Sequence, residues 1–213
     1  EKRINEDPIQ QRSGSENYGY SMNGGITYAE PLGTHSQITI GYNVNYNESD
    51  ADRLTHLFDD KIKDFSPEIA PEYSNSHNTS YLTHRVGPGF RYSKKKNTIV
   101  ANVYYQYSAL DGNIVGAAQS DKIQKDYHNV LYFAMVNYMF NKENSIRLFF
   151  RSYTDNPSVT QLQSIYDVST PQYLSIGNKD LNPSFTHRIN FHYINSNVEK
   201  GRTFMWMFMM QNQ

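Results

Sequence analysis

The stretch from Val130 to Tyr153 constrains the fold more than any other part of the chain. Apolar side chains recur at every second position on both sides of a short polar segment, Asn141 to Ser145. They are Val130, Tyr132, Ala134, Val136, Tyr138 and Phe140 in the first arm, and Ile146, Leu148 and Phe150 in the second. A period of two places side chains on one face of a strand, so the stretch predicts a long β-hairpin. The opposite face of its second arm alternates arginines with aromatic residues and is expected to face water or polar partners.

The same alternation of apolar residues recurs along the chain and predicts about eight strands. They span residues 18–28, 38–47, 81–92, 99–107, 130–140, 146–153, 185–193 and 203–210. Residues 1–17 are polar without a period and are predicted to form a loop. Gly24 and Gly25 are expected to loosen the first strand or mark a bulge, and Pro88 fits poorly in a paired interior strand.

The predicted connections alternate in length. The connections after the first, third, fifth and seventh strands are short. Residues 48–80, 111–128 and 156–184 form long polar connections. In an up-and-down meander this places the tight turns on one rim and the long loops on the other, as in outer-membrane barrels. The first long connection also predicts a short helix, capped by Ser49 or Asp50. Its apolar residues are Leu54, Leu57, Phe58, Ile62 and Phe65.

Composition is compatible with such a barrel. The mean hydropathy is -0.73, and no run approaches the roughly 18 apolar residues of a membrane helix. Barrel strands are short and alternate lipid-facing with lumen-facing residues, so their average hydropathy stays low. The formal net charge of -1 gives no general attraction for nucleic acid.

No motif indicates an enzyme, a metal site or a cofactor. The chain has no cysteine, and its seven histidines lack the spacing of a zinc site. Asp50 and Asp52 have the spacing that begins a calcium loop, but the glycine and the closing glutamate are missing. No Gly-x-Ser-x-Gly elbow is present.

Three segments resemble a known family. Tyr28 to Gly33, Tyr-Ala-Glu-Pro-Leu-Gly, precedes a Ser-x-Ile-x-Ile-x-Tyr strand and resembles a periplasmic turn of TonB-dependent outer-membrane receptors, in their outer-membrane-protein β-barrel branch. Residues 156–163 and 174–183 resemble that branch's "PS-x-x-QL" and "GNPDLKPE" loop segments. Lys179 stands where that pattern has proline, and Ser184 where it has glutamate.

The resemblance implies an all-β fold in which residues 18–213 form part of a transmembrane barrel in the outer membrane of a Gram-negative bacterium. Short turns would face the periplasm and long loops the exterior. About eight strands are roughly a third of a 22-stranded plugged transporter. It further implies that outer loops capture a solute, that a plug domain and TonB are partners in the full-length protein, and that a surface lipoprotein can be another partner.

Candidate contact residues follow from these faces. The arginines assigned to the lumen are expected to contact an acidic plug surface or an anionic solute, because guanidinium binds carboxylate and phosphate in bidentate geometry. Pairing with neighbouring strands, or plain solvation, explains them equally well. They are Arg85, Arg91, Arg147, Arg151 and Arg188. The candidate contacts in the third long loop are Tyr166, Tyr173, Asn178 and Asp180.

Two other functions fit the sequence. One is an outer-membrane barrel with an adhesive or structural role, and the other is a soluble β-rich carbohydrate-binding module with tyrosines as sugar platforms. Aromatic residues on the outside of a barrel more often form girdles at the membrane interfaces.

Overall fold

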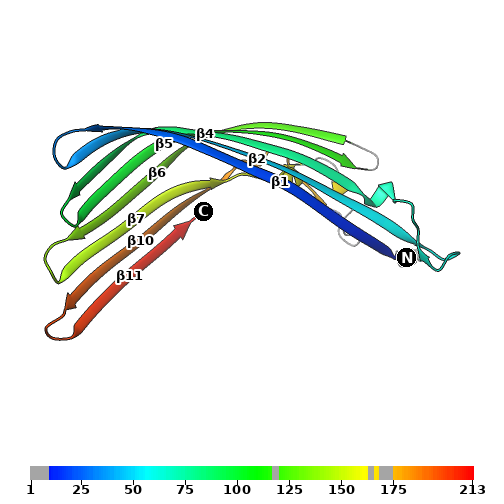
Figure 1. Cartoon of the computed structure of the whole chain (residues 1–213). Coiled ribbons are helices and arrows are strands. Elements are labelled where there is room, and N and C mark those ends of the chain that lie inside the picture. The colour runs from blue at the N-terminus through cyan, green and yellow to red at the C-terminus, as the bar shows by residue number, and fades with distance from the viewer. Residues whose placement is uncertain (1–9, 117–119, 163–165, 168–174) are drawn as a thin grey trace.

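The computed structural model describes residues 10–116, 120–162, 166–167 and 175–213. These form a nine-stranded antiparallel sheet in which the main strands pair in chain order, β1-β2-β4-β5-β6-β7-β10-β11, with β3 as a side branch on β2. Figure 1 shows the sheet curved and open, and β1 and β11 are not paired with each other. Among the described residues, no helix is long and apolar enough to cross a membrane. The predicted up-and-down meander is confirmed.

The strand bounds show five long strands followed by three shorter ones. They are β1 Gln11–Pro31, β2 Ser36–Asp59, β4 Asn75–Lys94, β5 Asn97–Gly116, β6 Ser120–Met139, β7 Asn144–Asp155, β10 Ser184–Asn197 and β11 Arg202–Asn212. The minor elements are β3 Asp64–Phe65, the 3-10 helix η1 Pro71–Tyr73, the helix α1 Val159–Leu162, and a separate pair formed by β8 Tyr166–Asp167 and β9 Ser175–Ile176.

The turns sort onto one rim of the sheet, as predicted. Residues 32–35, 95–96, 140–143 and 198–201 connect successive strands at the same end, on the left in Figure 1. Residues 60–74 and 156–183 connect strands at the opposite end. The strict alternation in length is wrong, because residues 117–119 alone separate β5 from β6 at the end with the long loops.

Three segments predicted as loops are strands. β1 begins at Gln11, β2 continues to Asp59, and most of residues 111–128 belong to the β5–β6 hairpin. The β1 extension is polar on both faces, and the β2 and β5–β6 extensions carry apolar residues too sparsely to show the regular alternation of a half-buried strand. Backbone pairing nevertheless continues, because each extension has a partner at constant register. Residues 1–9 lie outside the described part.

The predicted helix after Ser49 is also wrong. Its apolar positions lie on β2 and on the hairpin that β2 forms with β3, where Phe58 pairs directly with Phe65. The two rings meet edge to face with centroids 5.6 Å apart. Leu54, Leu57 and Phe58 therefore matched a helical period by coincidence of spacing within a strand.

The two faces of the sheet differ in character. The outer face is the one that carries Ile38, Ile40 and Tyr42, which are 45%, 54% and 39% exposed. Along its middle it forms an apolar band across all the main strands. Representative exposed members are Ile26, Val86, Val103, Val130, Tyr132, Trp206 and Phe208. Such a continuous apolar surface is far larger than soluble monomers usually expose.

The inner face carries the alternate residues and is partly covered by the third long loop. Val159 and Leu162 of this loop pack against β5 and β6 and are 3% and 0% exposed. Their partners on the inner face are Leu110, Ile114, Ile123 and Tyr127. Gly112 leaves room for this contact, since a Cβ there would lie 2.6 Å from Val159 Cγ2. The part of the loop around α1 is thus held against the sheet.

Pro88 is accommodated within β4 by a local gap in the ladder. β4 and β5 pair on both sides of Gly87 and Pro88 at unchanged register, but these two residues pair only with β2. At this gap β5 approaches Gly87 so closely that a Cβ there would lie 1.9 Å from the Val103 carbonyl oxygen. Gly24 and Gly25 cause no bulge, because the β1–β2 register is constant along the whole pairing.

Candidate functional site: the arginine-lined inner wall

The five arginines predicted to face the lumen all lie on the inner face. Arg85 pairs with Asn43 and Gln106, and Arg91 pairs with Gln37. Arg151 and Arg188 lie directly opposite each other on β7 and β10. Arg147 lies four residues from Arg151 on β7. The structure therefore brings the β7 and β10 arginines together, places Arg85 nearby, and leaves Arg91 apart.

Charge is unevenly divided between the two faces, with the inner face mainly basic and the outer face mainly acidic. By the strand registers, the basic residues of the inner face are Arg53, Arg85, Arg91, Lys125, Arg147, Arg151 and Arg188. The outer face carries the acidic residues Glu16, Glu30, Glu48, Asp50, Asp52, Asp111 and Asp126, together with the basic residues Arg12, Lys94, Lys122 and Arg202. On the inner face of the described main strands, the carboxylates are Asp59, Asp121 and Asp155, all near the rim with the long loops. The formal net charge of -1 conceals this separation.

A hydrogen-bond network joins Arg85 to the end of β7. Arg85 Nη2 donates to Gln106 Oε1 at 2.7 Å, and Gln106 Nε2 donates to Thr154 Oγ1 at 2.8 Å. Gln106 lies on β5, two strands away from β7, yet it is hydrogen-bonded to Thr154 and is only 3% exposed. The end of β7 therefore crosses over the inner face of β6. β7 separates from β6 at Ser152, directly after the last β6–β7 pair. There the Ser152 Oγ accepts a hydrogen bond from the Tyr132 backbone N–H at 2.7 Å.

Two depressions lie beside these arginines on the inner wall. One, of about 400 Å³, is lined by Arg85, Asn102, Tyr104, Phe133, Phe149, Arg151 and Tyr153, among others. The other, of about 410 Å³, is lined by Met135, Asn137, Arg147, Phe149, Arg188, Asn190, His192 and Met209, among others. They share Phe149. Arg151 also stacks on Tyr153, with the guanidinium carbon 4.9 Å from the ring centroid.

The candidate residues of the third loop are only partly described. Tyr166 belongs to β8, and Tyr173 lies outside the described residues. Asn178 and Asp180 are exposed, and the Asp180 backbone N–H donates to Asn178 Oδ1 at 2.8 Å. Sequence reasoning missed Lys179, whose Nζ lies 2.9 Å from Asp121 Oδ1 on β6. The residue that departs from the family pattern therefore ties the loop to the wall.

Tyr81 supplies another tie between the wall and the third loop. Its hydroxyl donates a hydrogen bond to the Pro157 carbonyl oxygen, and the ring packs against the buried cluster beneath α1. Tyr81 lies beyond the apolar band, where burial raises the pKa of its hydroxyl above the ordinary value. The hydroxyl therefore remains a donor at any physiological pH.

Replacing Tyr81 by Phe in the full-length protein is expected to destabilise the docked loop by about 1 kcal/mol, because it removes one hydrogen bond while keeping the ring. Proteolytic cleavage within residues 156–183 should then be roughly fivefold faster, since cleavage follows the population of the open loop. Tyr138→Phe on the outer face is the control. Equal cleavage rates in the two variants would show that the Tyr81 hydroxyl does not hold the loop.

Comparison with known proteins agrees with this architecture. The family model described as the outer membrane protein beta-barrel family matches residues 1–209. The chain belongs to this family. The barrel therefore resides in the outer membrane of a Gram-negative bacterium, as predicted. No curated protein shows a significant match to the chain.

Family membership assigns an environment to each face of the barrel. The outer face with its apolar band contacts lipid, and the inner face with its arginines faces the barrel interior. The short turns lie at the periplasmic rim and the long loops at the extracellular rim. The strand extensions of β1, β2, β4, β5 and β6 then rise beyond the membrane, because about 9 to 11 residues of a strand suffice to cross it.

Aromatic residues mark the extracellular border of the lipid-facing band. Tyr42, His84, Tyr107 and His128 stack in sequence across four strands, with successive centroids 6.1, 6.1 and 5.2 Å apart. Next to this row, Tyr20 and Tyr46 both donate to Glu48 Oε2 at 2.7 Å, and these bonds lower the pKa of the Glu48 carboxyl. The arrangement is that of an interfacial girdle.

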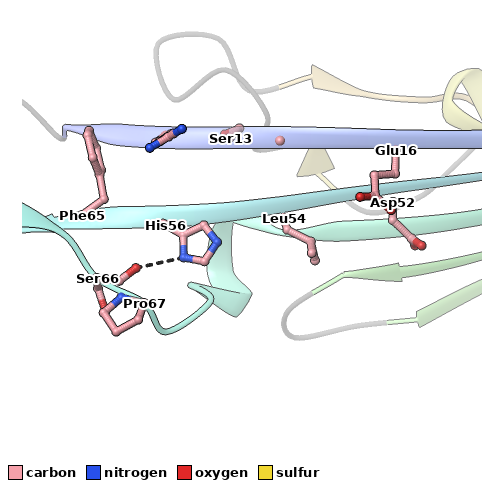
Figure 2. Close-up of a pocket in the computed structure, with 10 residues that line it drawn as sticks. Ser13, Glu16, Asp52, Leu54, His56, Phe65, Ser66 and Pro67 are labelled. Atoms are coloured by element: carbon pink, nitrogen blue, oxygen red, sulfur yellow. Dashed lines mark hydrogen bonds between the residues drawn. The ribbon is translucent and has the colours of Figure 1, made fainter.

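A depression of about 600 Å³ also lies on the outer face, above the girdle. Arg12, Glu16, Asp52 and His56 line it from β1 and β2, and residues 65–67 close one end (Figure 2). His56 Nδ1 donates to the Ser66 carbonyl oxygen at 2.9 Å, which fastens this segment to β2. Because the depression faces away from the barrel interior, it is not part of a solute path through the barrel.

Proposed function

We propose that this barrel is part of a TonB-dependent uptake receptor. The observation that carries the proposal is the basic inner wall, with the third loop folded onto it. A barrel that served only as an anchor or adhesin would gain nothing from unneutralised arginines inside its wall, because like charges on neighbouring strands are destabilising. An uptake receptor has a use for them, since its interior must hold a plug and pass a solute.

The loop and turn segments that resemble TonB-dependent receptors support the same function. In this proposal the partners are a plug domain within the barrel, TonB on the periplasmic side, and a surface lipoprotein at the extracellular loops. An adhesive or structural barrel remains the competing function. The soluble carbohydrate-binding module is not favoured, because the chain belongs to an outer-membrane family.

Uptake can be tested before the solute is identified. Three strains are grown in the same complex medium: the parent, a strain lacking the gene for this protein, and a strain lacking TonB. Mass spectrometry of the spent media should reveal at least one solute that the parent depletes and that both deletion strains leave behind. Restoring the full-length gene should restore depletion.

The opposite result has a clear meaning. If the strain lacking this gene depletes every solute as the parent does, but loses attachment to a surface or the integrity of its envelope, the barrel has a structural role. Depletion that requires this gene but not TonB would make the barrel a passive channel.

A further inference from the structure

The arrangement of Arg151 and Arg188 is electrostatically unfavourable as it stands. The two residues are direct cross-strand partners, and by strand alternation both project from the inner face. Their other neighbours in the same row, Phe133 and Gln211, carry no charge. Like charges directly opposite each other destabilise a sheet unless something neutralises them.

The described part of the surrounding wall supplies no neutralising group. Among the described residues, neither depression is lined by a carboxylate. Within the described residues, the ion pairs join Lys122 to Asp111 and Lys179 to Asp121, away from Arg151 and Arg188. Arg147, Arg151 and Arg188 are exposed to the barrel interior, and the buried Arg85 Nε donates to no described group. The wall therefore offers several guanidinium donors to an anion.

The floor between the guanidinium groups is apolar. Phe133 and Phe149 meet edge to face with centroids 5.4 Å apart, and Met135 and Met209 line the same wall. Aromatic rings and thioethers form adaptable surfaces for apolar groups. Inorganic phosphate would bind the arginines and would not contact this apolar surface. An anion with an apolar or aromatic body would use both.

The size of the site also suits a small molecule. The two depressions, of about 400 and 410 Å³, meet at Phe149, and each lies within the usual range of ligand pockets. We propose that this wall is a binding site for a small amphipathic anion, a carboxylate or phosphate attached to an apolar body. The inference rests on the proposed uptake function and names the class of solute that the barrel interior recognises.

Binding can be measured with a matched pair of probes. The full-length protein in lipid nanodiscs is dialysed against 2-naphthoate or against the neutral 2-naphthalenemethanol, with empty nanodiscs as the blank. Naphthoate should bind more tightly than the alcohol. In the double variant Arg151→Gln, Arg188→Gln, naphthoate affinity should fall about tenfold to a hundredfold, the range expected when charged hydrogen bonds are lost. Binding of the alcohol should be unchanged.

Arg91→Gln is the matched control, because Arg91 lies on the same face but lines neither depression. Its naphthoate affinity should equal that of the unmodified protein. If the double variant does not fold, a salt titration of the unmodified protein replaces it, and naphthoate binding alone should weaken as salt rises.

Three results would overturn the proposal. Naphthoate affinity could be unaffected by both the double variant and salt, or it could fall equally in Arg91→Gln, which would indicate a diffuse field. Naphthoate could also bind only after removal of the plug, which would assign the arginines to plug docking. Since the measurement needs no energised membrane, failure of the site and failure of TonB-dependent uptake are distinguishable.

Discussion

Replacing Gly87 by Ala is expected to lower the free energy of unfolding of the barrel by about 3 kcal/mol or more, or to block its assembly. The added Cβ would lie 1.9 Å from the Val103 carbonyl oxygen and 2.8 Å from Tyr104 Cα. Both are backbone atoms, so no side chain can rotate away to make room. β4 and β5 would have to separate where Pro88 already interrupts their ladder.

The matched control is Gly24→Ala, also in the middle of a strand. A Cβ at Gly24 would meet only Val44 Cγ1, at an ordinary contact distance of 3.8 Å. The change should be neutral or slightly stabilising, because alanine has less conformational freedom to lose on folding. Urea titration of the full-length protein refolded into lipid vesicles measures both. Similar midpoints for the two variants would disprove the close approach at Gly87.

The strands and their faces were predictable wherever one side meets lipid. Period two is a strong signal when apolar and polar residues alternate, as in residues 38–46 and 130–140. Beyond the membrane the signal weakens, because the inner face there is covered by loops only in places, as at Thr55 and at Ile114 and Ile123, and polar residues lie between these positions. Strand pairing there depends on partners distant in sequence, and no local pattern reports those partners.

The candidate site was predictable residue by residue but not as an arrangement. Alternation places the arginines on one face. The pairing of Arg151 with Arg188 depends on the register between β7 and β10. No local sequence pattern predicts that register, because residues 156–183 separate the two strands. The Arg85–Gln106–Thr154 network depends on the departure of β7 from β6, and Gln106 carries no sequence signal for burial. Lys179 could have been identified as unusual, though not its partner Asp121.

The replacement of Val44 by Arg is expected to destabilise the barrel in lipid by about 1 kcal/mol, because Val44 pairs with His84 of the aromatic row at the membrane border, whereas Asn45→Arg should have little effect. The two residues are adjacent on β2 and so lie at nearly the same depth, but they point to opposite faces. Val44 lies on the outer face with Tyr42, and Asn45 lies on the inner face between Asn23 and Thr83, which carry no charge. An arginine at Val44 would enter the border of the hydrocarbon, where its charge has no partner. An arginine at Asn45 would enter the hydrated interior.

Urea titration in vesicles measures the free energy of unfolding of both variants. The sign of the difference shows which face contacts lipid. A register slip of one residue between β2 and its neighbours would exchange the faces of the whole strand and reverse the result. Greater damage from Asn45→Arg would therefore turn the arginines toward lipid and remove the basis for an interior site. Equal damage would mean that neither face contacts hydrocarbon. Only a selective loss at Val44 agrees with a lipid-facing band and an arginine-lined interior.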